Sequence, residues 1–208
     1  ALGEVVVVLQ NKGAQVLHDF LPYFAFVYRR LSLDVNWRVR MELNRVLSTI
    51  ATINKRSLGP HMNALIGYWW CALQDSSRDV AAVAREAFDA AIATKKQPSV
   101  IAFLSPHILA FIKSNLDATP EGLSDKSQFS QEDAEDRYIM AVVASLEALG
   151  ALMGALTPVD LTTMLTQSAH TDSFGADTED AVSLADVIND KLWKKLGAKR
   201  MLIRQTTL

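Results

Sequence analysis

Residues 34–50, DVNWRVRMELNRVLSTI, carry a pattern that returns 41 residues later as DSSRDVAAVAREAFDAAI, residues 75–92. Each copy opens with an aspartate, Asp34 or Asp75, whose carboxylate can cap the first turn of a helix. Apolar residues then recur every three or four positions, which indicates one buried stripe along each helix. An apolar segment with a proline near its start precedes each copy. The pattern therefore predicts a repeated pair of helices.

A helix pair that recurs about every 40 residues is typical of HEAT and armadillo arrays. One such pair cannot bury its own apolar face, so neighbouring pairs must stack. We therefore predict an all-α fold, a HEAT/armadillo-like α-solenoid, over the whole chain. The expected organisation is repeats at about 15–54 and 58–94, longer irregular helices over 98–167, and the start of a further repeat at 184–208.

The helix boundaries follow from apolar periodicity and from turn residues. The valine-rich segment Glu4–Gln10 is expected to end a helix, and Pro106 is expected to kink or split the helix that contains it. Ser130 should cap a long helix that runs to about Leu156. The predicted helices are about 15–32, 36–54, 60–73, 78–94, 98–116, 131–156 and 158–167, with another from about 184.

Composition limits the classes of protein that fit. Half of the 208 residues are apolar, which is enough for a substantial core. The single cysteine, Cys71, excludes a disulfide framework and a cysteine-rich zinc module within this chain, and favours a reducing compartment. The chain opens at Ala1 without a signal-like stretch, so we expect a piece of a longer protein. Residues 138–156 are apolar enough to cross a bilayer, but Glu147 at their centre favours a buried helix and no membrane contact.

Nothing in the sequence indicates catalysis. There is no phosphate-binding glycine loop, no zinc-like spacing of histidine or cysteine, and no nucleophile elbow. The four histidines are scattered, and Cys71 follows two tryptophans in an apolar segment typical of a core. We therefore expect no catalytic site, no cofactor and no metal in this chain.

Charge is distributed unevenly although the net charge is only −2. Between residues 117 and 186 acidic residues dominate, whereas residues 29–56 and 191–204 are basic. Such clusters are commonly the solvated faces of exposed helices, and the alternative is a surface that faces phosphates. The candidate phosphate-facing residues are Arg29, Arg30, Arg38, Arg40, Arg45, Lys55 and Arg56. Arg40 also occupies a repeat position that often bonds to a neighbouring aspartate, so a structural role is open.

Several segments resemble one known family in consistent order. They are LPYFAFVYRRLSLDVNWRVR (21–40), GPHMNALIGYWWCALQDSSRDVAAVAREAFDAAI (59–92), KKQPSVIAF (95–103), EGLSDKSQFSQEDAEDRYIMAVVASLEAL (121–149) and LWKKLGAKRMLIRQ (192–205). Together they are similar to the N-terminal domain of the listerin family, the RING-type E3 ubiquitin ligases of ribosome-associated quality control. The resemblance covers about residues 17–208 and departs at the valine-rich start and around 168–182.

The resemblance implies a docking role in the cytosol. Family members ubiquitinate nascent chains stalled on the large ribosomal subunit, and their N-terminal domain contacts that subunit and the partner that senses the stalled chain. It also implies that the zinc-binding RING, which engages the E2, lies elsewhere in the parent protein. The basic candidates would then contact ribosomal RNA. The competing hypothesis is a generic HEAT-repeat adaptor for an acidic or helical peptide, and an enzyme is the third and least favoured interpretation.

Overall fold

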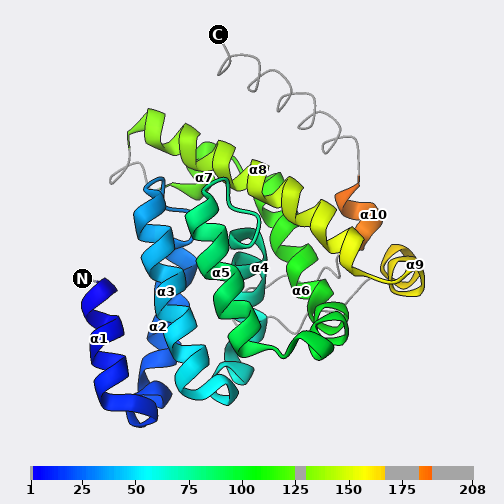
Figure 1. Ribbon diagram of the computed structural model, residues 1–208. Coiled ribbons are helices and arrows are strands. Elements are labelled where there is room, and N and C mark those ends of the chain that lie inside the picture. Colours follow the sequence, from blue (N-terminus) through cyan, green and yellow to red (C-terminus); the bar gives the residue numbers. More distant parts are fainter. Residues whose placement is uncertain (1, 125–129, 167–182, 189–208) are drawn as a thin grey trace.

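The computed structural model describes residues 2–124, 130–166 and 183–188, and within these ranges it is all-α, without a strand (Figure 1). The eight longer helices are α1 (Leu2–Lys12), α2 (Leu17–Leu31), α3 (Trp37–Asn54), α4 (Met62–Ala72), α5 (Arg78–Ala91), α6 (Gln97–Asp117), α8 (Gln131–Ala155) and α9 (Pro158–Thr166). Shorter elements are η1 (Gly13–Val16), η2 (Lys55–His61), η3 (Thr94–Lys96), α7 (Pro120–Leu123) and α10 (Leu184–Val187). The seven helices predicted between residues 15 and 167 are present to within a few residues of their ends, whereas the helix predicted from about 184 is described only over α10 and otherwise lies outside the described residues.

The first six long helices form two layers. α1, α3 and α5 pack side by side and run in the same direction, while α2, α4 and α6 form the second layer behind them (Figure 1). α8 then crosses α6 and α4. The core lies between the layers, where Tyr28, Leu47, Trp69 and Phe88 are fully buried.

The two copies of the sequence pattern form equivalent structures, as predicted. The carboxylate of Asp34 accepts a hydrogen bond from the N–H of Asn36 at 2.8 Å, and that of Asp75 accepts one from the N–H of Ser77 at 2.8 Å. The aspartates are not the caps themselves, because the N-cap residues are Asn36 for α3 and Ser77 for α5. The expectation of a direct aspartate cap was therefore wrong by two residues, since the carboxylate orders the turn that enters the helix.

The tryptophans of the GYWW motif join the layers. Trp69 packs edge-on against Phe88, with ring centroids 5.4 Å apart, and its indole N–H donates to the Ala84 carbonyl at 3.0 Å. The indole N–H of Trp70 donates to the carbonyl of Ala148 on α8 at 2.9 Å. Both rings are buried and Tyr68 is half-buried, so two of the three aromatic residues belong to the core, as predicted.

The glycine of the same motif permits a close helix crossing. A Cβ atom placed on Gly67 would lie 2.4 Å from the Phe111 Cβ, well inside van der Waals contact. The ring of Phe111 then packs on Tyr68, with centroids 4.1 Å apart. The absent side chain of Gly67 therefore sets the separation of α4 and α6.

Pro106 does not split its helix, because α6 is continuous from Gln97 to Asp117. A proline lacks the N–H that would bond the carbonyl four residues earlier, which is that of Ala102. The hydroxyl of Ser105 donates to this carbonyl at 2.7 Å. The neighbouring serine thus replaces the lost backbone bond, which explains why the expected break is absent.

Two segments, Thr94–Asp117 and α8, are long and apolar enough to span a membrane by length and composition alone. In the structure α6 contributes Ile108 and Ile112 to the shared core, and α8 contributes Ser145 and Leu149. Glu147 lies on the exposed side of α8. One face of residues 138–156 packs into the core, as expected, whereas Gly150 and Met153 join Glu147 on an exposed face, and the absence of membrane contact stays a prediction.

Candidate nucleic-acid interface

The structure places five of the seven basic candidates at the two ends of α3, while Arg40 and Arg45 lie within that helix. Arg29 and Arg30 lie in the last turn of α2, beside Arg38 in the first turn of α3. Lys55 and Arg56 follow the last turn of α3, which has 18 residues. At a rise of about 1.5 Å per residue, the two groups are roughly 27 Å apart. The single continuous basic edge expected from sequence is therefore two separate groups.

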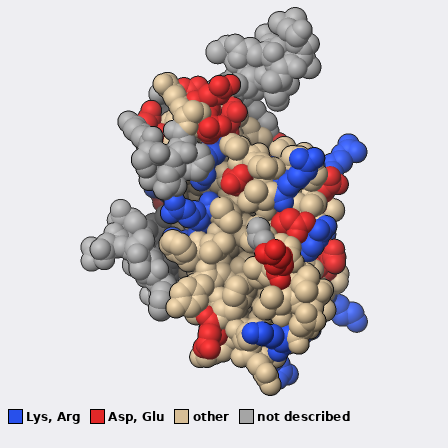
Figure 2. All heavy atoms as spheres, turned by 90° about the vertical axis from the view of Figure 1, so that its left-hand side faces the viewer, with Lys and Arg blue, Asp and Glu red and all other residues tan. Residues whose placement is uncertain are grey.

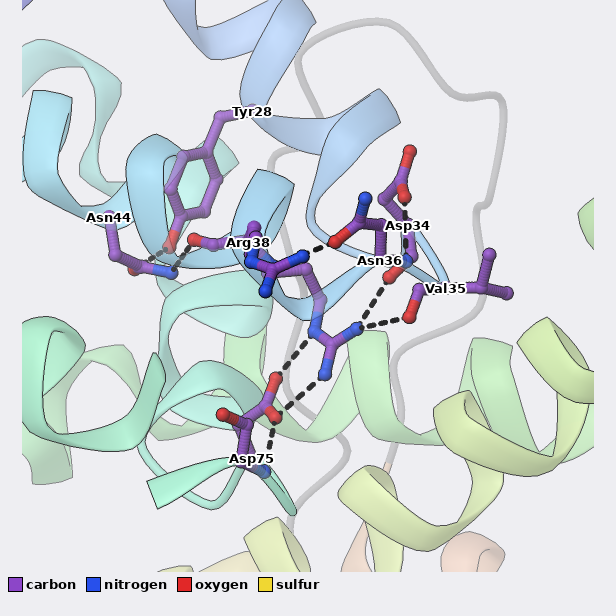
Figure 3. Close-up of polar contacts among 9 residues, drawn as sticks. Tyr28, Asp34, Val35, Asn36, Arg38, Asn44 and Asp75 are labelled. Carbon is purple, nitrogen blue, oxygen red and sulfur yellow. Dashed lines mark hydrogen bonds and ion pairs between the residues drawn. The ribbon is translucent and has the colours of Figure 1, made fainter. Parts of the chain in front are cut away.

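Arg40 is buried and joins α3 to the turn before α5, where its partner Asp75 lies (Figure 3). Its guanidinium donates twice to the Asp75 carboxylate, from Nε at 2.7 Å and from Nη2 at 2.8 Å. Nη1 donates to the carbonyls of Asp34 at 2.6 Å and Val35 at 3.2 Å. The Arg40 and Asp75 side chains are only 5% and 8% exposed. Arg40 is thus fully engaged in a buried ion pair and is not accessible to a phosphate.

A buried polar chain extends this contact into the core (Figure 3). The carbonyl of Arg40 accepts from the Asn44 amide at 2.8 Å, and Asn44 in turn accepts from the Tyr28 hydroxyl at 2.8 Å. Burial raises the pKa of Tyr28 well above its ordinary value, so this hydroxyl remains a donor. These bonds fix α2 against α3, and the hydroxyl of Tyr28 and the amide of Asn44 are both buried.

The exposed arginines of the first group already have intramolecular partners. Arg29 donates to the Tyr68 hydroxyl at 3.3 Å, and the Arg38 guanidinium lies 5.1 Å from the Trp37 ring centroid. Arg45, in the middle of α3, pairs with Glu42 one turn away. These contacts are on the surface, where each contributes little to stability.

Acidic residues surround the same end of the layers. α8 begins at this end of the layers (Figure 1). Arg137 in its second turn is close enough to Asp34 and Arg30 to interact with them electrostatically. The first two turns of α8 carry Glu132, Asp133, Glu135 and Asp136, all exposed. Figure 2 shows a dense group of acidic side chains at this end, while acidic and basic side chains are interspersed over the rest of the face. The local field at Arg29, Arg30 and Arg38 is therefore mixed.

The opposite end carries basic residues that the sequence analysis did not connect. Because α1, α3 and α5 are parallel, their C-terminal ends lie together (Figure 1). Lys12 ends α1, and Lys95 and Lys96 follow α5, so they join Lys55 and Arg56 at this end, all five being exposed. We call these five residues the C-terminal basic rim. An available signal was the recurrence of lysine at or just after the end of each helix of the layer.

An open hollow of about 570 Å³ lies beside the C-terminal basic rim. Its walls are the last turn of α3, the first residues of η2 and Ala90 of α5, with Lys55 and Arg56 at its border. The Asn54 side chain lines it and makes no capping hydrogen bond. This end therefore combines positive charge with a recess that is open to solvent.

No metal-binding group of three or more histidine, cysteine or acidic side chains occurs among the described residues. Cys71 is buried, which raises the pKa of its thiol to about 12, so it is a core residue as expected and a poor ligand. One cysteine in 208 residues cannot supply the ligand set of a RING zinc site. The basic residues expected near the C-terminus, and residues 189–208 as a whole, lie outside the described part of the chain.

Comparison with known proteins gives a consistent family. The sequence model described as "E3 ubiquitin-protein ligase listerin, N-terminal domain" matches residues 1–208. The chain is 32% identical over 162 residues to listerin of Xenopus tropicalis, which is 77% of this chain and 10% of that protein. It is 31% identical over 157 residues to listerin of Gallus gallus (75% and 9%), and 30% identical over 154 residues to that of Mus musculus (74% and 9%).

The chain thus spans about a tenth of the length of these relatives. No solved structure matches it significantly. The shared region includes most of the helices described above, since it extends over about three quarters of the chain. The chain belongs to the family of listerin N-terminal domains.

Proposed function

We propose that this chain is the docking domain of an E3 ubiquitin ligase that marks nascent chains stalled on the large ribosomal subunit. The match of residues 1–208 to the N-terminal domain of listerin carries the proposal. The described residues add a packed helical body with exposed basic groups, which suits a docking module. Ubiquitin transfer and the zinc of the RING then belong to other parts of the parent protein, where the E2 binds.

We also propose that the fold is a HEAT-like α-solenoid. Its support is the 41-residue sequence period, the equivalent turns at Asp34 and Asp75, and the alternation of successive helices between two layers. Helical repeats of this kind present extended surfaces to large partners. Such a surface suits a ribosomal subunit and a second protein that senses the stalled chain.

The cytosol is the proposed compartment. A free buried thiol such as that of Cys71 is compatible with a reducing environment, and the two long apolar helices α6 and α8 place side chains in the core and need no bilayer. A fluorescent fusion of the full-length protein that fractionates with cytosolic ribosomes would agree with this assignment, and one retained in membranes would contradict it.

Co-sedimentation tests the docking role directly. The 208-residue chain is mixed with purified large subunits, small subunits or neither, and the pellets are compared after centrifugation through a sucrose cushion. We expect enrichment with large subunits only, and a decrease as salt rises if charged groups contribute. Equal recovery with both subunits or with neither would contradict the proposal and favour a generic helical-repeat adaptor, for which the same helical surface would hold a peptide.

A further inference from the structure

We infer that the C-terminal basic rim, Lys12, Lys55, Arg56, Lys95 and Lys96, binds the phosphate backbone of double-helical RNA. The inference rests on the proposed function for the source of the RNA, which is ribosomal RNA. The phosphate chemistry follows from the surface itself. It moves the candidate interface away from Arg29, Arg30 and Arg38 to the opposite end of α3.

The rim has the excess of charge that such a contact needs. All five side chains are exposed, and within the described ranges no ion pair joins any of them to a carboxylate. Three carboxylates lie near this end: Asp89, which accepts from the Gln97 amide at 2.8 Å, Asp19 in the first turn of α2, and Glu86 of α5, which lines a recess with Thr52 and Ile53. Five cations therefore outnumber the nearby carboxylates, whereas the other end combines its arginines with the acidic start of α8.

The dimensions fit a nucleic acid. Adjacent helices in a layer lie about 8–10 Å apart, so the ends of α1, α3 and α5 spread the charges over roughly 20 Å. A DNA duplex carries about one phosphate charge per 1.7 Å of its axis when both strands are counted, so a duplex of this length carries roughly a dozen phosphates, and those on its near side can reach the rim. The hollow beside Lys55 and Arg56 gives a sugar–phosphate strand room to approach the last turn of α3.

The same surface is poorly suited to a peptide. Protein interfaces usually centre on buried aromatic or aliphatic anchors. The exposed large apolar side chains of the described residues do not occur in the segments that form this end, residues 9–16, 51–61 and 88–98. A partner must therefore be recognised here mainly through charge and hydrogen bonds, which is how phosphate backbones are bound.

The simpler explanation is that these cations only stabilise helix C-termini, where positive charge is favourable by about 0.3–1 kcal/mol each. Lys12 and Lys55 occupy such positions, but Lys95 and Lys96 lie in η3, beyond the end of α5. Stability and RNA binding separate the two explanations, because a purely capping role changes the melting temperature and leaves the salt dependence of binding unaltered.

The test uses anisotropy of a fluorescein-labelled RNA duplex of about 16 base pairs, titrated with the 208-residue chain between about 50 and 200 mM KCl. Five phosphate contacts give a slope of log affinity against log salt of about −3.5 to −4.5. The variant K55Q/R56Q/K95Q should flatten this slope by about 2.1–2.7. The control R38Q/R78Q/R85Q removes the same charge from exposed positions outside the rim and should change it by less than about one.

Two further variants guard against misfolding. K12Q/K95Q/K96Q tests the rim without touching the end of α3, and K55R/R56K/K95R keeps every charge and should bind as the parent does. Circular dichroism melting verifies that each variant folds. Equal slopes for the rim and control variants, or full binding by both rim variants, would overturn the inference.

Co-sedimentation of the same variants with ribosomal subunits distinguishes a failure of this inference from a failure of the proposed function. If the parent pellets with large subunits and the rim variants pellet equally across the salt series, the rim inference fails while the docking role stands. If the parent binds the duplex through the rim but pellets with neither subunit, the docking role fails and the RNA surface stands. Loss of both duplex and subunit binding in the rim variants alone supports both.

Discussion

Removing the Arg40 guanidinium should strongly destabilise the fold, because the ion pair that it forms with Asp75 is buried. Its Arg40→Met variant leaves the Asp75 carboxylate, 8% exposed, without the partner that holds it with two bonds of 2.7 and 2.8 Å. It also removes the donors to the carbonyls of Asp34 and Val35. Breaking a buried pair in this way costs about 3–5 kcal/mol. For a domain of this size, that corresponds to a fall in Tm of roughly 6–20 °C.

A double-mutant cycle isolates the ion pair. Asp75→Asn keeps an oxygen that can accept from the Ser77 N–H and removes only the charge. Because the double variant R40M/D75N no longer buries an unpaired carboxylate, its loss should be smaller than the sum of the single losses by about 0.5–3 kcal/mol. Urea denaturation followed by circular dichroism measures all four proteins. Strict additivity, or a loss below about 1 kcal/mol for Arg40→Met, would refute the structural role. If the Arg40→Met variant bound RNA more weakly at unchanged stability, Arg40 would instead be an exposed residue that contacts RNA.

The remaining predictions concern the core. Gly67→Ala introduces a Cβ 2.4 Å from that of Phe111, so α4 and α6 must separate. Thermal melting should show a loss of stability of about 1–3 kcal/mol. An unchanged Tm would mean that the two helices are not in close contact. Phe88→Ala and Leu47→Ala each empty a fully buried site and should lower the free energy of unfolding in urea by about 2–5 kcal/mol, whereas Val7→Ala, at an exposed position, should change it little. Stability should fall above pH 9, because burial raises the pKa of Cys71 from 9.0 to about 12 and the folded state therefore keeps a proton that the unfolded chain loses. Burial also raises the pKa of Tyr28 above its ordinary value of 10.0, which adds to the fall above pH 10. Each group contributes a slope of about 1.4 kcal/mol per pH unit, and Cys71→Ala should abolish the first step.

The sequence was most informative for features that depend on the residues of a single helix. Apolar spacing located α3 and α5 and their equivalence, because a buried stripe has the same period wherever the helix packs. It was less informative for features that depend on the local backbone conformation or on the orientation of one side chain. The role of Asn36 as the cap of α3 depends on which residue of the turn leaves the extended conformation, and the continuity of α6 depends on a rotamer of Ser105.

The candidate site was harder to predict for a related reason. Sequence separation groups Arg38 with Lys55, although the length of α3 keeps them at opposite ends. The same sequence separates Lys12, Lys55 and Lys95, which the parallel packing of α1, α3 and α5 brings to one end. Burial of Arg40 could be anticipated only as one of two alternatives, because its partner Asp75 lies 35 residues away. Charge patches are thus properties of packing direction, which a single sequence expresses only indirectly.

The bond from the Trp70 indole to the Ala148 carbonyl has a consequence for how the chain unfolds. In a simple linear array each unit touches only its neighbours, so unfolding can start at one end and proceed stepwise. Here the donor and acceptor are 78 residues apart, and α8 contacts both α4 and α6. Detaching α8 leaves a buried donor without a partner and uncovers the core of α4, so we expect the segment from α4 to α8 to open as one cooperative unit. Native-state amide exchange should then show a single opening energy for the buried amides of α4, α6 and α8, while those of α1 exchange earlier.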